Sequence, residues 1–294
     1  MFYRRKILLA LLQIFEGELP KIDLQKHLFL LSSSKPEPYF EFIPYRYGCF
    51  SFQANQDLST LKKYGLVEES EKCWQLGDKK NYLDELKIGD KVSLAGHYQR
   101  YRHLKGNNLI KYVYEKYPYL AINSIIAESL LDNDDYQAVI NSKPRKNNYA
   151  LYTIGYEGKT VEYFTNQLIQ EDIRILCDIR KNAFSMKFGF SKKQLQMIIW
   201  NVGIKYVHLP ELGIDSDKRQ KLSSKKDYEK LFEDYEKNIL PANYSALEKL
   251  YKIFLFNKRA ALMCFESDYT CCHRSRTLNA LLKLNKKDII TKNI

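Results

Sequence analysis

A chain of 294 residues with 45% hydrophobic residues, 23 Tyr and 15 Phe has ample apolar surface for packed cores, which excludes a largely disordered protein. Its length favours two domains over one, because single cores rarely grow beyond this size. The formal net charge of +12 favours a polyanionic partner, nucleic acid before anionic lipid, although a lysine-rich composition alone also gives a high isoelectric point.

Neither a membrane-spanning helix nor a signal peptide is expected. The sequence has no run of eighteen apolar residues, and its opening apolar stretch soon meets Gln13 and Glu16 without a small-residue cleavage site. Six scattered cysteines fit reduced thiols better than disulfides. We therefore expect a cytoplasmic protein with no membrane partner.

The first part of the chain predicts helices followed by a β-ribbon, the order typical of a winged-helix domain. We place this α+β domain at residues 1–92. Its predicted elements are helices at 3–15, 21–33 and 53–65, an extended aromatic stretch at 39–50, and short strands in "LVEES" and "CWQLG".

The third predicted helix has the composition of a recognition helix. Leu58 and Leu61 form its inward stripe, which leaves polar side chains outside. Asn and Gln can bond adenine edges, and Lys can bond phosphates. The predicted nucleic-acid-binding residues are Gln53, Asn55, Gln56, Lys62 and Lys63. The alternative is a solvated helix face in a winged helix that binds protein.

The stretch "EFIPYRYGCFS" at residues 41–51 resembles the signature of Panacea-type (SocA-like) domains, in which a similar run precedes a helix and a "GLV" turn. This resemblance covers residues 3–80. Residues 93–148 are expected to form a helical connector, in which basic side chains alternate with Tyr98 and Tyr101. Such a pattern can track a nucleic-acid backbone, or it can mark a helix pair with half-buried tyrosines.

Residues 149–294 alternate between strand and helix patterns, which predicts a parallel α/β sheet with helices on both faces. Ligands on such sheets bind beyond the carboxyl ends of the strands. The predicted strands "LYTIGY", "RILCDIR", "KYVHLP" and "AALMCFE" all end in glycine or titratable residues. We therefore expect a functional site at this edge.

The motifs "TIGYEGKTVEYF", "LCDIRKNAFSMKFGFSKKQL", "GIKYVHLPELG" and "ALMCFESDYTCCHRSRTL" together resemble the DUF488 family over residues 150–285. The resemblance implies a compact α/β domain and a site, but no particular reaction. Carried over residue by residue, it implies site positions at Gly155, Tyr156, Glu157, Gly158, Asp178, Arg180, Ser185, His208, Glu266, Cys272, His273 and Arg274. From their chemistry we expect catalytic roles for Glu157, Asp178, His208, Glu266, Cys272 and His273. We expect substrate binding by Gly155, Tyr156, Gly158, Arg180, Ser185, Arg274 and the added Arg276.

Cys272 can be interpreted in three ways. It precedes a predicted helix and is flanked by His273, Arg274 and Arg276, a setting that favours a reactive thiolate. The same setting can bind a phosphate without chemistry. In the third interpretation, an arginine pairs with Asp178 or Glu266 and the cysteine is simply buried.

Two further expectations concern acid–base groups and metals. Glu157 and Glu266 can act as general acid and base if burial raises either pKa, with His208 as the alternative. No metal is expected, because adjacent Cys271 and Cys272 cannot easily ligate one tetrahedral ion together. No cofactor is expected either.

These observations lead to the hypothesis of a nucleic-acid-binding protein, with DNA as the expected partner. Its α/β pocket would recognise or process a base or nucleotide in DNA modification, repair or defence. The first alternative is a non-enzymatic DNA-binding regulator that senses a small anionic ligand. The second is a protein-interaction component of a toxin–antitoxin or other defence assembly.

Overall fold

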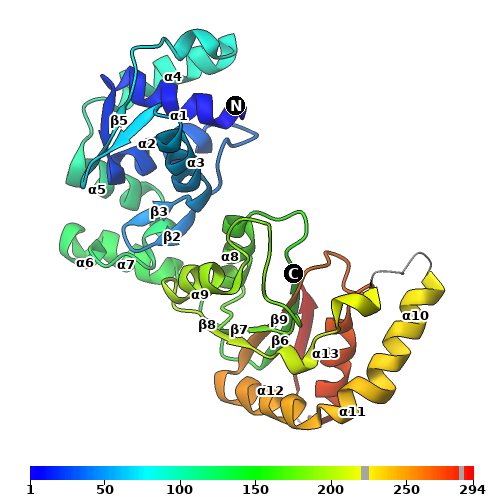
Figure 1. The fold of residues 1–294 in the computed structure, drawn as a ribbon. Coiled ribbons are helices and arrows are strands. Elements are labelled where there is room, and N and C mark those ends of the chain that lie inside the picture. The colour runs from blue at the N-terminus through cyan, green and yellow to red at the C-terminus, as the bar shows by residue number, and fades with distance from the viewer. Residues whose placement is uncertain (220–224, 285–287) are drawn as a thin grey trace. The chain divides into compact units, whose positions relative to one another are not determined.

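The computed structural model describes residues 1–219, 225–284 and 288–294. They form two compact units, Met1–Lys143 and Pro144–Ile294 (Figure 1). The helices described here include none that is both long and apolar enough to cross a membrane.

The first unit combines helices with short antiparallel strands. Its sheet has the order β1-β5-β4, and β2 and β3 form a separate hairpin. The elements are α1 (Tyr3–Ile14), β1 (Glu18–Pro20), α2 (Lys21–Ser33), β2 (Ile43–Tyr45), β3 (Gly48–Phe50), α3 (Phe52–Lys63), β4 (Val67–Glu69), β5 (Cys73–Leu76), α4 (Ile88–Tyr101), α5 (Gly106–Lys116), α6 (Ala127–Leu130) and α7 (Asn133–Ser142). The three predicted helices and the β4–β5 ribbon are confirmed, whereas the sequence does not predict β1.

Residues 93–143, expected as most of a separate connector, are part of the first unit. Helices α4 and α5 pack against α2, and α4 also packs against α1. Between α2 and α4 the rings of His27 and His97 meet, with Nε2 of His97 3.3 Å from Nδ1 of His27. Both rings are buried, so this part of the chain contributes to the core of the unit.

The second unit is an α/β domain around a five-stranded parallel sheet of order β10-β6-β9-β7-β8, so the predicted fold class is confirmed for this unit. The sequence does not predict β10. The elements are β6 (Ala150–Gly155), α8 (Val161–Gln170), β7 (Ile175–Asp178), α9 (Lys192–Trp200), β8 (Lys205–His208), α10 (Lys225–Asp234), α11 (Leu240–Ala242), α12 (Tyr244–Asn257), β9 (Arg259–Cys264), α13 (His273–Leu284) and β10 (Ile290–Asn293).

Helices cover both faces of this sheet. One core cluster joins Cys177 and Leu262 to residues of α10, α12 and α13, such as Leu250. Because successive side chains of a strand point to opposite faces, Leu176 and Met263 lie on the other face, and both are fully buried. Figure 1 shows α8 and α9 on that side. Residues at the ends of the strands are therefore divided between two faces.

Candidate functional site

The carboxyl ends of β6, β9, β7 and β8 meet at one edge of the sheet, and Gly155 closes β6 there. A Cβ at Gly155 would lie 1.8 Å from the carbonyl oxygen of Glu266, so only glycine lets the two segments approach. Just beyond it, the backbone N–H groups of Tyr156 and Glu157 both donate to the carbonyl of Phe265, at 3.1 and 2.9 Å. The loops after β6 and β9 are thereby held together.

On the α8/α9 side of this edge, Asp178 is the centre of a buried polar cluster. Arg180 donates to both carboxylate oxygens through Nε at 2.9 Å and Nη2 at 2.6 Å, and the hydroxyl of Tyr206 donates at 2.6 Å. Nη1 of Arg180 donates to the hydroxyl of Tyr156 at 3.0 Å. The ring of Tyr156 stacks on Phe190, with centroids 4.4 Å apart.

The charged and polar groups of this cluster are hydrogen-bonded to one another. Although burial opposes it, the hydrogen bonds and charge of Asp178 raise the pKa of Arg180. Burial, followed by the charge of Asp178, raises the pKa of Tyr206. A carboxylate that is fully enclosed and already accepts these donors is arranged to fix the strand ends.

On the opposite side of the edge, the end of β9 meets the start of α13. Nδ1 of His273 lies 3.7 Å from Sγ of Cys264 and 3.8 Å from Sγ of Cys272. Nε2 of the same ring is 3.0 Å from the carbonyl oxygen of Ile179, just after β7. All three side chains are buried, so this is a compact thiol–imidazole cluster.

The two arginines expected to activate Cys272 or hold an anion are occupied otherwise. Arg274 is fully buried and donates to the backbone carbonyls of Glu266 and of Ser267, the latter at 3.0 Å. Arg276 lies over the ring of Phe232 and 3.7 Å from Glu236. Both guanidinium groups support local structure.

Of the three interpretations of Cys272, the buried cysteine agrees with the structure, and a thiolate favoured by a lowered pKa does not. Its side chain is 1% exposed, and burial raises its pKa well above the ordinary value, with the neighbouring Cys264 as the next cause. Arg274 lowers the pKa, but this is the smallest contribution. Desolvation outweighs nearby positive charge here because a buried thiolate loses its hydration.

A cavity of about 410 Å³ opens beside this cluster. Four predicted site residues line it: Glu157, Glu266, Cys272 and His273. The remaining lining residues are Tyr228, Leu231, Phe232, Phe265, Asp268 and Cys271. One carboxylate oxygen of Glu157 accepts from the backbone N–H and hydroxyl of Ser267, at 2.9 and 3.1 Å, which holds the rim of the cavity in place.

Other predicted site residues lie away from this cavity. Nε2 of His208 is 2.8 Å from the carbonyl oxygen of Arg180, so its ring braces the end of β8. The hydroxyl of Ser185 accepts from the N–H of Lys187 at 3.1 Å and shapes the loop before α9. Gly158 has a φ of +73°, which the turn before α8 requires.

The predicted nucleic-acid-binding residues belong to α3 in the first unit. Asn55, Lys62 and Lys63 are exposed, whereas Gln53 and Gln56 are partly covered. Lys62 pairs with Glu69 at 2.9 Å, and this carboxylate also accepts from Lys21 at 2.7 Å. The exposed face of α3 therefore carries amide and ammonium groups next to the β4 strand.

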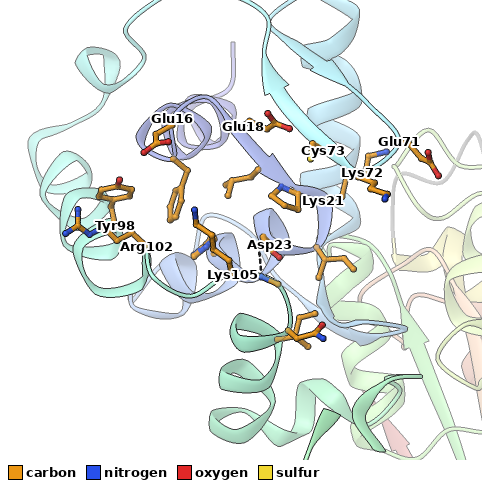
Figure 2. A pocket seen from close by; sticks show the side chains of 18 residues that line it. Glu16, Glu18, Lys21, Asp23, Glu71, Lys72, Cys73, Tyr98, Arg102 and Lys105 are labelled. Carbon is orange, nitrogen blue, oxygen red and sulfur yellow. Dashed lines mark hydrogen bonds between the residues drawn. The ribbon is translucent and has the colours of Figure 1, made fainter. Parts of the chain in front are cut away.

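A larger cavity, of about 920 Å³, lies in the first unit. Figure 2 shows cationic and acidic side chains interleaved around it. Asp23 is the most enclosed of its carboxylates, and it accepts from the N–H of Gly106 at 3.0 Å while burial raises its pKa. The charged residues lining it are Glu16, Glu18, Lys21, Asp23, Glu71, Lys72, Arg102 and Lys105. Because four acidic and four basic side chains line it together, this cavity shows no preference for a ligand of either charge, and we assign the candidate site to the smaller one.

Several residues of the candidate site were not singled out from the sequence as site members. Tyr228 and Phe232 come from α10, and Phe265 follows β9. Cys264 lies in the predicted strand "AALMCFE" and is not among the predicted site residues, yet it completes the buried thiol–imidazole cluster. The alternation of apolar and charged residues in "KDYEKLFEDYEK" predicts a helix at α10. It does not show which edge of the sheet that helix reaches.

Taken together, the fold and site define an α/β domain with a ligand-sized cavity at the carboxyl edge of a parallel sheet. Residues 160–281 match the family described as domain of unknown function DUF488, and the second unit contains that domain. The match begins after the "GYEG" segment. No family match supports the resemblance of residues 3–80 to Panacea-type domains, and no curated protein matches the chain.

Proposed function

We propose that this protein binds nucleic acid through its first unit and accepts a nucleobase in the 410 Å³ cavity of its DUF488 domain. The observation that carries the proposal is the lining of that cavity, in which aromatic rings and carboxylates occur together. Tyr228, Phe232 and Phe265 supply the rings, and Glu157, Glu266 and Asp268 supply the carboxylates.

The lining favours a base over a phosphate. Aromatic side chains stack on nucleobases of any sequence, because every base has a π-face. Carboxylates accept hydrogen bonds from the exocyclic amino groups of cytosine and adenine. Three carboxylates repel a phosphate, and Arg274 is already bonded to backbone carbonyls. A nucleotide would therefore enter base first.

For the first unit, support comes from the order of its elements and from α3. Three helices followed by the antiparallel strands β4 and β5 follow the winged-helix order, in which the third helix enters the major groove. The exposed side chains of Asn55, Lys62 and Lys63 are of the kinds that bond base edges and phosphates. The net charge of +12 belongs to the whole chain and favours a polyanionic partner, with 22 Lys and Arg against 18 Asp and Glu in residues 1–148.

The cavity is tested by calorimetric titration of the full chain with deoxynucleosides and with deoxyribose 5-phosphate. We expect deoxycytidine and deoxyadenosine to bind more tightly than thymidine, and the sugar phosphate to bind least. Phe265→Ala, at a cavity-lining ring that is 43% exposed, should weaken binding by roughly 5- to 100-fold, the loss of one stacking contact. Glu248→Gln, on an exposed position of α12, is the matched control and should leave affinity unchanged. Preferential binding of the sugar phosphate would instead support an anion sensor and contradict the proposal.

The first unit is tested by the salt dependence of binding to a labelled DNA duplex. Replacing Lys62 and Lys63 together by Ala should lower the slope of log K against log salt by about 2, one released counterion for each phosphate contact. Lys116→Ala, on an exposed residue at the end of α5, should leave the slope unchanged. An unchanged slope in the double variant would remove α3 from the interface and favour a protein partner.

A further inference from the structure

The thiol–imidazole cluster where the end of β9 meets the start of α13 has the dimensions of a metal site. Its three potential ligand atoms are Sγ of Cys264, Sγ of Cys272 and Nδ1 of His273, and they all lie within 4.8 Å of one another. A tetrahedral zinc ion with Zn–S of about 2.3 Å and Zn–N of about 2.0 Å would separate sulfur and nitrogen by about 3.5 Å. The observed separations are 3.7 and 3.8 Å.

The orientation of the imidazole also suits a metal. The carbonyl oxygen of Ile179 can only accept, so Nε2 of His273 carries the hydrogen and donates to it at 3.0 Å. In the neutral ring Nδ1 then has its lone pair available, on the side where both sulfur atoms lie. A backbone carbonyl that fixes the tautomer of a histidine in this way is the usual outer support of a metal ligand.

The ligands are also held rigidly. Cys264 is the last residue of β9, paired with Gly155 of β6, and His273 is the first residue of α13. Arg274 holds the loop between them in place by donating to the backbone carbonyls of Glu266 and Ser267. The two segments that carry the ligands are therefore fixed to the sheet and to each other, which preorganises the three atoms.

We propose that Cys264, Cys272 and His273 bind one zinc ion through Sγ, Sγ and Nδ1. Two thiolates and a neutral imidazole suit zinc, and the two thiol protons leave to solvent on binding, so that the buried site carries no net charge. Three protein ligands leave a fourth position for water, and Cys272 and His273 line the 410 Å³ cavity from which that water would come. Cys271, which we weighed as a ligand from the sequence, is exposed and lies outside this set.

The test uses the full chain, reconstituted with zinc alone, desalted and analysed for metal content; no nucleobase is present, so its result is independent of the proposed function. We expect about one zinc ion per chain, and at least about a tenfold loss in Cys264→Ser and in Cys272→Ser. Cys271→Ser is the matched control, one residue from a ligand, and should keep full occupancy.

If a serine variant fails to fold, measurements on the wild-type protein alone still test the proposal. Its cobalt-substituted form should show sulfur-to-cobalt charge-transfer absorption, and X-ray absorption of the zinc form should show two sulfur atoms and at least one nitrogen. Folded wild-type protein that retains no zinc after reconstitution would overturn the proposal. So would Cys271→Ser losing the metal as fully as Cys272→Ser.

Discussion

Acid should destabilise the first unit through the His27–His97 pair. Burial, then the neighbouring His97 and Lys105, lowers the pKa of His27 to about 3, and burial lowers that of His97 to about 4. In the unfolded chain both rings have a pKa near 6.5. Between pH 6.5 and pH 4 the unfolded state therefore binds more protons than the folded state, and stability falls as the pH falls.

The size of the effect follows from these values. At pH 5 an unfolded ring of ordinary pKa gains about 2 kcal/mol from protonation that the folded ring does not, so the two rings together cost the folded unit about 4 kcal/mol relative to pH 8. His97→Phe removes one ring and should reduce this pH-dependent loss by about 2 kcal/mol. His103→Gln, at an exposed position of the same unit, is the control and should change nothing.

Urea unfolding at pH 8, 7, 6 and 5, followed by tryptophan fluorescence, measures this loss. The chain has two tryptophans, and Trp200→Phe leaves only Trp74, which is buried in β5 of the first unit. Carboxylates such as Asp23 also titrate, but their contribution cancels when variants are compared in this background. Equal pH dependence in the wild type and in His97→Phe would refute the reasoning, as would direct NMR titration of either ring above pH 6.

Three further changes test the packing, two at the strand ends of the second unit and one on a helix of the first. Asp178→Asn leaves the buried Arg180 without its charge partner and should lower the free energy of unfolding in urea by about 3–5 kcal/mol. The control Glu248→Gln should lower it by less than about 0.5 kcal/mol. A loss below about 1 kcal/mol for Asp178→Asn would contradict the role of the ion pair. Gly155→Ala pushes a Cβ into the carbonyl of Glu266 and should lower the melting temperature by several degrees. Gly96→Ala, in an open position on α4, should raise stability by about 0.5–1 kcal/mol, and a loss there would contradict the packing described.

Much of the second unit could be predicted because its local signals agree. The strand centres are apolar and the intervening helices carry one apolar stripe, so each element follows from its own residues. The apolar pattern of the helix after β9 begins with "TLNALLKL", whereas α13 begins at His273. The polar residues of "CCHRSR" give its first turn no apolar pattern. His273 and Arg274 are buried there because they bond the backbone carbonyls of Ile179, Glu266 and Ser267, and the local sequence does not predict these contacts.

The separation of the strand-end residues onto two faces of the sheet could not be predicted in the same way. Asp178 and Cys264 both end strands at one edge, and a sequence reading groups them as one set of charged and reactive residues. In the structure Asp178 faces α8 and α9 with Leu176, whereas Cys264 faces α13 with Leu262. The alternation of side chains along a strand puts neighbouring residues on opposite faces of the sheet. Only the registers of β7 against β9 and β8 show which residues of different strands share a face.

The two proposals for the second unit bear on each other while remaining separable. Aromatic rings and carboxylates are sufficient for recognition of a base, but burial raises the pKa of the Cys272 thiol and makes it a poor nucleophile. A zinc ion on Cys264, Cys272 and His273 would change this, because a zinc-bound water ionises near neutral pH and can attack a bound ring. Base binding without zinc would therefore indicate a sensor, and zinc with base binding would indicate a hydrolytic enzyme. Metal content measured beside base binding thus separates recognition alone from recognition together with a group that could activate water.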